Sequence, residues 1–219
     1  AGNPFFGDFL LGLGYSPGSN DLLVADASFG VSKVYRVKSD GTVETVAGTG
    51  LPTMPGEEFL GGPGPSVTLL EPRALKVDTA GNVFIADTGH GRIIKVAPNG
   101  ATSRVAQFST GRGVEAAFPA GIALAGNSVF SANGNEQQIV RATGSNITFV
   151  GQFGSVCDFS ASNCGDGGPG TEATLNLPTT STDIPLIGIE GDASGIYILD
   201  QTPAQRSRVR YLNTSGASV

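Results

Sequence analysis

The residues best placed to do chemistry occupy a recurring polar position, which is filled by Asp26, Asp87, Asn133 and Asp200. Each closes a short run rich in apolar and β-branched residues, such as VFIA before Asp87. A carboxylate at the end of a strand accepts backbone N–H groups of the turn that follows, and this role needs no ligand. The alternative is a calcium ion held jointly by Asp26, Asp87 and Asp200, because Ca²⁺ binds about six to eight oxygens. Since the position recurs in every copy, we favour the structural role, with no cofactor required.

The single histidine limits the enzyme classes open to this chain. Without His90, neither a histidine-rich zinc site nor a Ser-His-Asp triad can be built. His90 lies in the turn sequence Thr88-Gly89-His90-Gly91. We therefore expect a solvent-facing turn residue.

Two stretches rich in glycine and proline carry the candidate binding residues, which are Glu57, Glu58, Phe59, Asp158, Phe159 and Asp166. A carboxylate pair acts as acid and base only in a dry, shaped pocket, so these loop positions favour surface contacts over catalysis. The glycine runs at 61–64 and 165–170 lack the Lys-Ser/Thr of a phosphate loop and are interpreted as bends.

Cysteine content and charge indicate the compartment and exclude several partners. Cys157 and Cys164 are seven positions apart and are predicted to form a disulfide, which favours an extracellular or cell-surface location. A chain that begins Ala1-Gly2-Asn3-Pro4 is compatible with a secreted product after cleavage. Asn146 and Asn213 each begin a glycosylation triplet. The net charge of −6, without a basic cluster, argues against nucleic acid, and no apolar run is long enough for a membrane span.

A unit of about 40 to 50 residues recurs along the chain, and its clearest copy surrounds the sequence GNVFIADTGHGRIIKV at 81–96. Short β-rich runs alternate with tight turns, which predicts a four-stranded antiparallel meander in each copy. A polar or basic residue and a β-branched residue open the third strand of each copy, as in Arg92-Ile93 and Arg208-Val209. One meander cannot bury both of its faces, so the copies must stack.

The best copy resembles the NHL-repeat family of β-propellers. The resemblance rests on Pro72, Gly81-Asn82, Ala86-Asp87-Thr88-Gly89 and Arg92-Ile93, which follow the motif of that family. The sequences VAGTG at 46–50 and GDGGP at 165–169, with LNLP at 175–178, resemble bacterial extracellular members. The resemblance implies blades arranged around a central channel.

The sequence thus predicts an all-β, propeller-like array of about four blades with the last one incomplete. The expected blades are 5–50, 72–110, 119–153 and 178–219 within a single domain, 1–219. We expect residues 1–7 to complete the last blade. The favoured function is a non-enzymatic extracellular module whose long loops, 51–71 and 154–183, bind a protein, a glycan or neighbouring copies, with self-association through an exposed blade edge. The alternative is a metal-assisted hydrolase or lyase with its site in the channel.

Overall fold

A computed structural model describes residues 6–51, 53–54, 59–108, 119–143, 146–152, 154–157, 163–178, 187–201 and 207–213. The chain divides into two compact units, Ala1–Thr110 and Gly111–Val219. Each unit contains two antiparallel sheets of the predicted meander type. The prediction of an all-β, propeller-like fold is confirmed, whereas the single domain stays a prediction.

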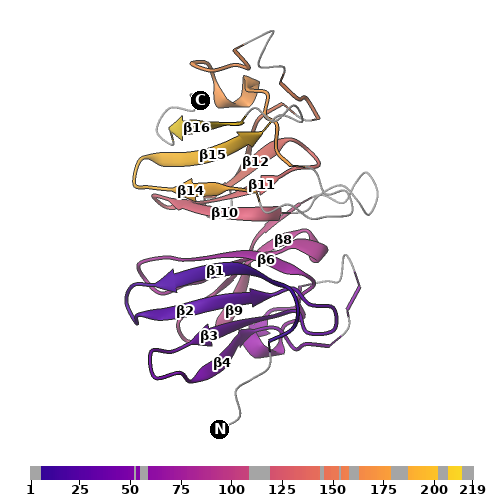
Figure 1. The fold of residues 1–219 in the computed structure, drawn as a ribbon, viewed down its shortest axis with the longest axis vertical. Helices are drawn as coiled ribbons and strands as arrows, with labels where there is room; N and C mark the ends of the chain where they lie inside the picture. Colours follow the sequence, from indigo (N-terminus) through magenta and orange to yellow (C-terminus); the bar gives the residue numbers. More distant parts are fainter. Residues whose placement is uncertain are drawn as a thin grey trace. The chain divides into compact units, whose positions relative to one another are not determined.

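The first unit holds blades 1 and 2 (Figure 1). Blade 1 has the strand order β1 (Leu10–Ser16), β2 (Asp21–Asp26), β3 (Lys33–Val37) and β4 (Val43–Ala47). Blade 2 has the order β5 (Gly62–Pro63), β9 (Ala101–Gln107), β8 (Arg92–Val96), β7 (Val83–Asp87) and β6 (Pro72–Val77). The extra strand β5 comes from the connection between the blades. Two short 3-10 turns belong to this unit, η1 (Gly64–Ser66) and η2 (Thr88–His90).

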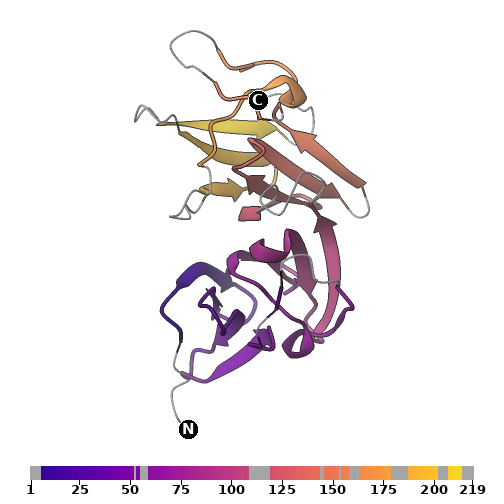
Figure 2. The ribbon, with the colours of Figure 1, turned by 90° about the vertical axis from the view of Figure 1, so that its right-hand side faces the viewer.

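The second unit holds blades 3 and 4. Blade 3 has the order β10 (Pro119–Ala125), β11 (Ser128–Asn133), β12 (Gln138–Thr143) and β13 (Asn146–Val150). In blade 4, β14 (Ile189–Gly191), β15 (Gly195–Gln201) and β16 (Ser207–Asn213) lie side by side, seen in orange and yellow in both views (Figures 1 and 2). The 3-10 turn η3 spans Gly170–Glu172. Within the described residues blade 4 has three strands.

Strand pairing shows that the four blades are copies of one unit. In blades 1 to 3 the residue that closes the second strand pairs with the one that opens the third, and these pairs are Asp26 with Lys33, Asp87 with Arg92 and Asn133 with Gln138. In blade 4 the equivalent pair, Asp200 with Arg208, lies one residue in from the strand ends. A register shift also recurs near the start of the first strand, between Leu10 and Gly12, Pro72 and Ala74, and Pro119 and Gly121. These pairings place equivalent residues of different blades in the same column.

The core lies between successive blades of each unit. We call the sheet face that points toward the next blade the trailing face, and the opposite one the leading face. One buried cluster joins Leu23, Ala25 and Val34 of blade 1 to Leu75 and Ile85 of blade 2, among others. A second cluster joins both blades of the other unit, and it includes Phe130, Ile139, Ile196 and Ile198. Blades in a unit therefore pack trailing face onto leading face.

The inner strands approach each other closely because blade 1 carries glycines there. A Cβ added to Gly14 would lie 2.1 Å from Cδ1 of Leu75, and one added to Gly12 would lie 3.0 Å from the carbonyl oxygen of Arg73.

Within the described residues, no helix has the length and apolar character of a membrane span.

Candidate functional site

The two long connections between blades end in the same structure. The sequences GPGPSVTLLEP at 62–72 and GPGTEATLNLP at 168–178 align without gaps. The first sequence is bonded to the end of blade 1, where Gly48 and Thr49 donate their N–H groups to the carbonyls of Gly64 and Val67. The second is bonded to the end of blade 3, where Gly151 and Gln152 donate to the carbonyls of Gly170 and Ala173. Only the earlier parts, 51–61 and 154–167, are therefore free to differ between the two connections.

The strand-end carboxylates hold the arriving connections in place. Oδ1 of Asp87 accepts the N–H of Leu70 at 2.8 Å, and Oδ1 of Asp200 accepts the equivalent N–H of Asn176 at 2.6 Å. Asp26 accepts the N–H groups of Gly7 and Ser28. All three carboxylates are fully buried. The backbone partners Gly7, Leu70 and Asn176 lie in the segments that precede each blade. The turns that follow contribute Ser28 to Asp26 and His90 to Asp87.

His90 is buried, so the expectation of a solvent-facing turn residue was wrong. Its Nδ1 lies 2.8 Å from Oδ2 of Asp87, and its Nε2 lies 3.2 Å from Oγ1 of Thr53. The connection folds over the turn and brings Thr53 onto the imidazole ring. Arg92, 1% exposed, donates from Nε to the same Oδ2 at 2.7 Å and from Nη2 to the carbonyl of Thr68 at 3.0 Å. The result is a closed polar cluster beneath the first connection.

The order Thr53, His90, Asp87 is also the order of hydroxyl, imidazole and carboxylate in nucleophilic hydrolases. Two observations favour a structural role here. The His90 ring has no exposed surface, and Oδ2 of Asp87 is shared with the Arg92 guanidinium instead of serving the imidazole alone. A buried ion pair with its hydrogen bonds satisfied fixes one conformation, and here it fixes the connection.

Blade 4 builds an equivalent cluster with a different arginine. Arg210 is 4% exposed, donates to the carbonyl of Thr174 at 2.6 Å and reaches Oδ2 of Asp200 at 3.2 Å. Its Nη2 donates to the carbonyl of Cys164 at 3.0 Å. Arg208 keeps the predicted pairing position but is half-buried, and it pairs with Asp166 at 2.8 Å. The buried cation of this cluster is thus Arg210, two residues further along the strand, although Nε of Arg208 also lies 3.5 Å from Oδ2 of Asp200.

Blade 3 replaces the ionic cluster by amides. Nδ2 of Asn133 donates to Glu136 at 2.9 Å, and its Oδ1 accepts the N–H of Glu136 at 3.4 Å. Burial raises the pKa of the Glu136 carboxyl above its usual value, and the bond from Asn133 opposes this shift. Gln137 holds the second connection through two hydrogen bonds to Leu177. Nε2 of Gln137 donates to the Leu177 carbonyl, and Oε1 of Gln137 accepts the Leu177 N–H.

The predicted loop residues fall into two groups. Glu57, Glu58, Asp158 and Phe159 lie outside the described residues. Phe59 is half-buried against the core, with the Arg92 guanidinium 5.1 Å from its ring centroid. Asp166 is exposed and pairs with Arg208 and, at 2.7 Å, with Arg210.

The disulfide predicted between Cys157 and Cys164 is present. It lies next to Asn176, whose Oδ1 accepts the N–H of Cys157. Asn146 opens β13 and Asn213 ends β16.

Calcium ligation by the strand-end carboxylates does not fit their surroundings. Both oxygens of Asp26 and of Asp87 already accept hydrogen bonds inside their own unit. Both oxygens of Asp200 do so too. Across the part of the chain that the structure describes, no three His, Cys, Asp or Glu side chains gather in a way that could hold a metal ion.

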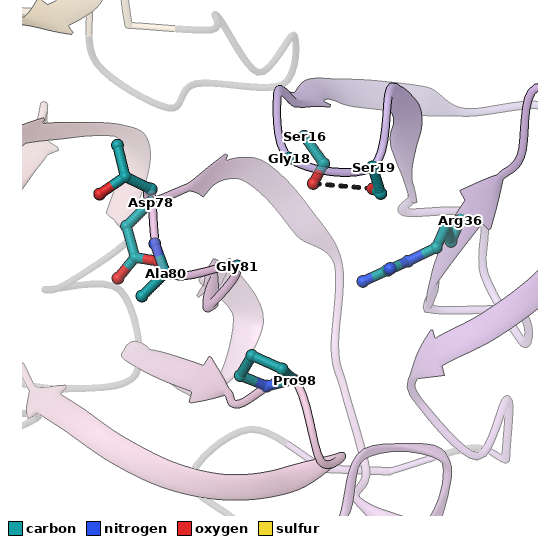
Figure 3. Close-up of a pocket in the computed structure, with 9 residues that line it drawn as sticks. Ser16, Gly18, Ser19, Arg36, Asp78, Ala80, Gly81 and Pro98 are labelled. Carbon is teal, nitrogen blue, oxygen red and sulfur yellow. Dashed lines mark hydrogen bonds between the residues drawn. The ribbon is translucent and has the colours of Figure 1, made fainter.

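A polar pocket of about 250 Å³ lies at the opposite end of the first unit, between the hairpin turns of blades 1 and 2 (Figure 3). Ser16 and Ser19 line one side, and the turn from Asp78 to Gly81 lines another. The Arg36 side chain extends into it, and its charge is matched by Asp21 at 3.5 Å and Glu44 at 3.7 Å. With Asp78 also present, the pocket suits a neutral polar group better than an anion.

The connection side of the first unit carries exposed apolar side chains. Phe29, in the turn between β2 and β3, is 95% exposed. Met54 and Leu60 are 74% and 87% exposed. Their neighbours in sequence are Thr53, which contacts His90, and Phe59, which contacts Arg92. Leu51 is 65% exposed at the start of the same connection. Exposed apolar side chains on rigidly held loops are typical of contact surfaces.

Comparison with known proteins supports the fold and leaves the family open. No protein-family model and no curated protein match this sequence. In structure the chain is similar to a catalytically inactive virginiamycin B lyase from Staphylococcus aureus with quinupristin, with a TM-score of 0.56 and 15% identity over 97% of this chain and 55% of that one. The chain has a β-propeller-like fold. Membership of the NHL-repeat family stays a prediction.

Two further solved structures give the same result. A streptogramin B lyase matches with a TM-score of 0.52 and 13% identity over 95% of this chain and 56% of that one. A protein of unknown function from Bacteroides thetaiotaomicron matches with a TM-score of 0.58 and 14% identity over 92% and 46%. The present chain spans about half the length of these structures.

Proposed function

We propose that this chain is a non-enzymatic extracellular binding and assembly module, and that it binds a protein through the connection side of its first unit. The observation that carries the proposal is the set of exposed side chains Phe29, Leu51, Met54 and Leu60 on loops that buried clusters hold in place. Aromatic and methionine side chains are enriched where proteins meet. Aliphatic side chains such as leucine form no hydrogen bonds with the hydroxyl groups of a sugar, so a protein partner is favoured over a glycan.

The disulfide supports the extracellular part of the proposal, because such bonds persist in oxidising compartments. The runner-up function is a metal-assisted hydrolase or lyase. The similarity to two lyases concerns the fold alone at these identities, and one fold hosts many functions.

The test is to immobilise the oxidised chain and bind the proteins secreted by its native cells. We expect one partner whose retention falls by at least about tenfold in a Phe29→Ser, Leu60→Ser double variant, as for loss of central contacts. A Val209→Glu variant, altered on an exposed residue of blade 4, should retain the partner. Equal retention by all three proteins would contradict the proposal. Turnover of a substrate that depends on an added divalent metal would favour the runner-up.

A further inference from the structure

The pocket between the hairpin turns of the first unit contains an arginine whose ion pairs are long. Arg36 of β3 extends into the pocket (Figure 3). Its partners Asp21 and Glu44 lie at 3.5 and 3.7 Å, which is longer than the roughly 2.7–3.2 Å of an N–H···O hydrogen bond. Its buried Nε donates to no acceptor in the part of the chain that the structure describes. Charge therefore holds this guanidinium in place, and the N–H groups at its tip can bind a ligand.

The second unit has an equivalent arginine, and there the protein itself supplies the partners. Arg141 occupies in β12 the position that Arg36 occupies in β3. Its Nε donates to Oγ of Ser128 at 3.1 Å, and its guanidinium lies 5.6 Å from the ring centroid of Phe130. The fold therefore does not require the cation in this column to extend into a pocket.

The walls of the pocket carry further polar groups. On one wall, Oγ of Ser16 accepts a hydrogen bond from the Ser19 hydroxyl at 3.0 Å, so the Ser16 proton can be donated to a ligand. On another wall, Oδ1 of Asp78 accepts the N–H groups of Ala80 and Asn82 at 3.0 and 2.8 Å. Oδ2 of Asp78 accepts Nδ2 of Asn82 at 2.7 Å. An ionised carboxylate has about four acceptor positions, so Asp78 can accept one more hydrogen bond.

Closed turns hold these walls in place before a ligand arrives, as is usual for binding pockets. The carbonyl of Ser16 accepts the N–H of Asn20 at 2.8 Å, and the carbonyl of Ala97 accepts the N–H of Gly100 at 2.8 Å. Pro98, in the second of these turns, adds an apolar surface against which the C–H groups of a ligand can pack. All of the lining residues belong to the described part of the first unit.

Charge and size narrow the class of ligand. The charged side chains in and around the pocket are two cations and three carboxylates, with a net charge of −1, and they are Arg36, Lys38, Asp21, Glu44 and Asp78. This balance disfavours an anion. The volume of about 250 Å³ is below the roughly 300–1,000 Å³ of pockets for drug-sized molecules. Neighbouring donors and acceptors suit hydroxyl groups, because each hydroxyl both donates and accepts.

We propose that this pocket binds a neutral ligand with adjacent hydroxyl groups, of the size of a single sugar unit. The planar guanidinium of Arg36 donates to two neighbouring hydroxyl oxygens, Ser16 donates to a third, and Asp78 accepts a hydroxyl proton. The inference goes beyond the proposed function and does not depend on it, because the pocket lies at the opposite end of the unit from Phe29 and the connection at 51–61.

The test is a titration of the isotopically labelled, oxidised 219-residue chain, followed by the amide signals in NMR spectra. The probes are methyl α-mannoside, methyl β-glucoside, methyl β-galactoside and N-acetylglucosamine, with acetate and inorganic phosphate as the anionic probes. At least one of the four sugars should bind in the millimolar range, since the affinity of a small ligand is limited by its number of atoms. It should shift the signals of Ser19 and Gly81 and leave that of Phe29 unchanged.

Variants of the lining connect binding to the pocket. Arg36→Lys keeps the positive charge but lacks the planar guanidinium, so it should weaken sugar binding by at least about tenfold. Ala80→Trp adds bulk at an exposed lining residue, removes no polar group, and should weaken binding to the same extent. Arg141→Lys is the matched control, because it changes the equivalent arginine of the second unit. It should bind like the intact chain.

Failure of all four sugars to bind would overturn the inference, as would equal affinities of Arg36→Lys and the intact chain. Tighter binding of acetate or phosphate than of any sugar would overturn it as well, because the pocket would then be an anion site. None of these results bears on the retention of a partner protein by the connection side, which is measured separately.

Discussion

Replacing Asp87 by alanine tests the claim that strand-end carboxylates hold the connections. Asp87 is fully buried and is the carboxylate that neutralises Arg92, which is 1% exposed. Removing one partner of a buried ion pair costs about 3–5 kcal/mol, because the other charge stays buried without compensation. This is a large fraction of the roughly 5–15 kcal/mol that stabilises a typical domain.

Asp26 provides the comparison for Asp87, because it is equally buried but has no arginine among its hydrogen-bond partners within the residues that the structure describes. It accepts two backbone N–H groups, from Gly7 at 2.7 Å and Ser28 at 3.1 Å. Leaving such donors unsatisfied costs about 1–3 kcal/mol. Asp26→Ala should therefore destabilise the first unit clearly less than Asp87→Ala does. Asp40→Ala is the control, because this aspartate is exposed and its bond to the N–H of Thr42 lies within a single hairpin turn.

The assay is urea unfolding followed by circular dichroism, with amide hydrogen exchange as a local readout. The Leu70 amide donates to Asp87 at 2.8 Å and should exchange faster in Asp87→Ala. A loss in Asp87→Ala no larger than in Asp26→Ala would refute the role assigned to the ion pair. Unchanged exchange at Leu70 would refute the clamp on the connection.

Three further predictions test packing, cross-linking and pH dependence. Gly14→Ala should lower the free energy of unfolding by about 1–3 kcal/mol, measured in urea, because its Cβ would lie 2.1 Å from Cδ1 of Leu75. The double variant Gly14→Ala, Leu75→Ala should lose less free energy than the sum of the two single variants. Replacing Cys157 and Cys164 by serine should lower stability by about 2–3 kcal/mol, the loop-closure value for this separation. Burial and then the Asp26 charge raise the pKa of Tyr35 above its usual value. The unfolded chain therefore ionises first, so stability should fall as pH rises through about 10, and less steeply in Tyr35→Phe.

Each of these has a result that would count against it. Gly18→Ala is the control for the glycine test, since no atom lies within 4 Å of its added Cβ, and an equal loss there would remove the steric argument. An unfolding midpoint unchanged by reductant would contradict the disulfide prediction. Parallel pH curves for the intact chain and Tyr35→Phe would show that the phenol of Tyr35 is not the group responsible.

Much of the fold was readable from the sequence because each blade is local. Turn residues and alternating apolar runs define neighbouring strands, and the columns from Asp26 to Asp200 follow from register alone. The burial of His90 was not readable in this way. A turn signal describes the backbone, whereas burial depends on the connection that folds over the turn and places Thr53 on the ring.

Two features were visible in the sequence but were not used. Aligning 62–72 with 168–178 would have shown that both connections end in one motif. Placing Leu13 and Tyr15 in the columns of Leu75 and Val77 would have shown an apolar face on blade 1. The move of the buried cation from Arg208 to Arg210 was not predictable, because either residue can reach Asp200 from β16.

The most direct test of the central claim is cross-linking mass spectrometry of the oxidised chain with its partner in native extracts. The account predicts that partner cross-links concentrate on the connection side of the first unit, around Phe29 and 51–61, and that they vanish in the Phe29→Ser, Leu60→Ser double variant. Cross-links confined to the hairpin turns at 16–19 and 78–81, or an identical pattern in the variant, would contradict it.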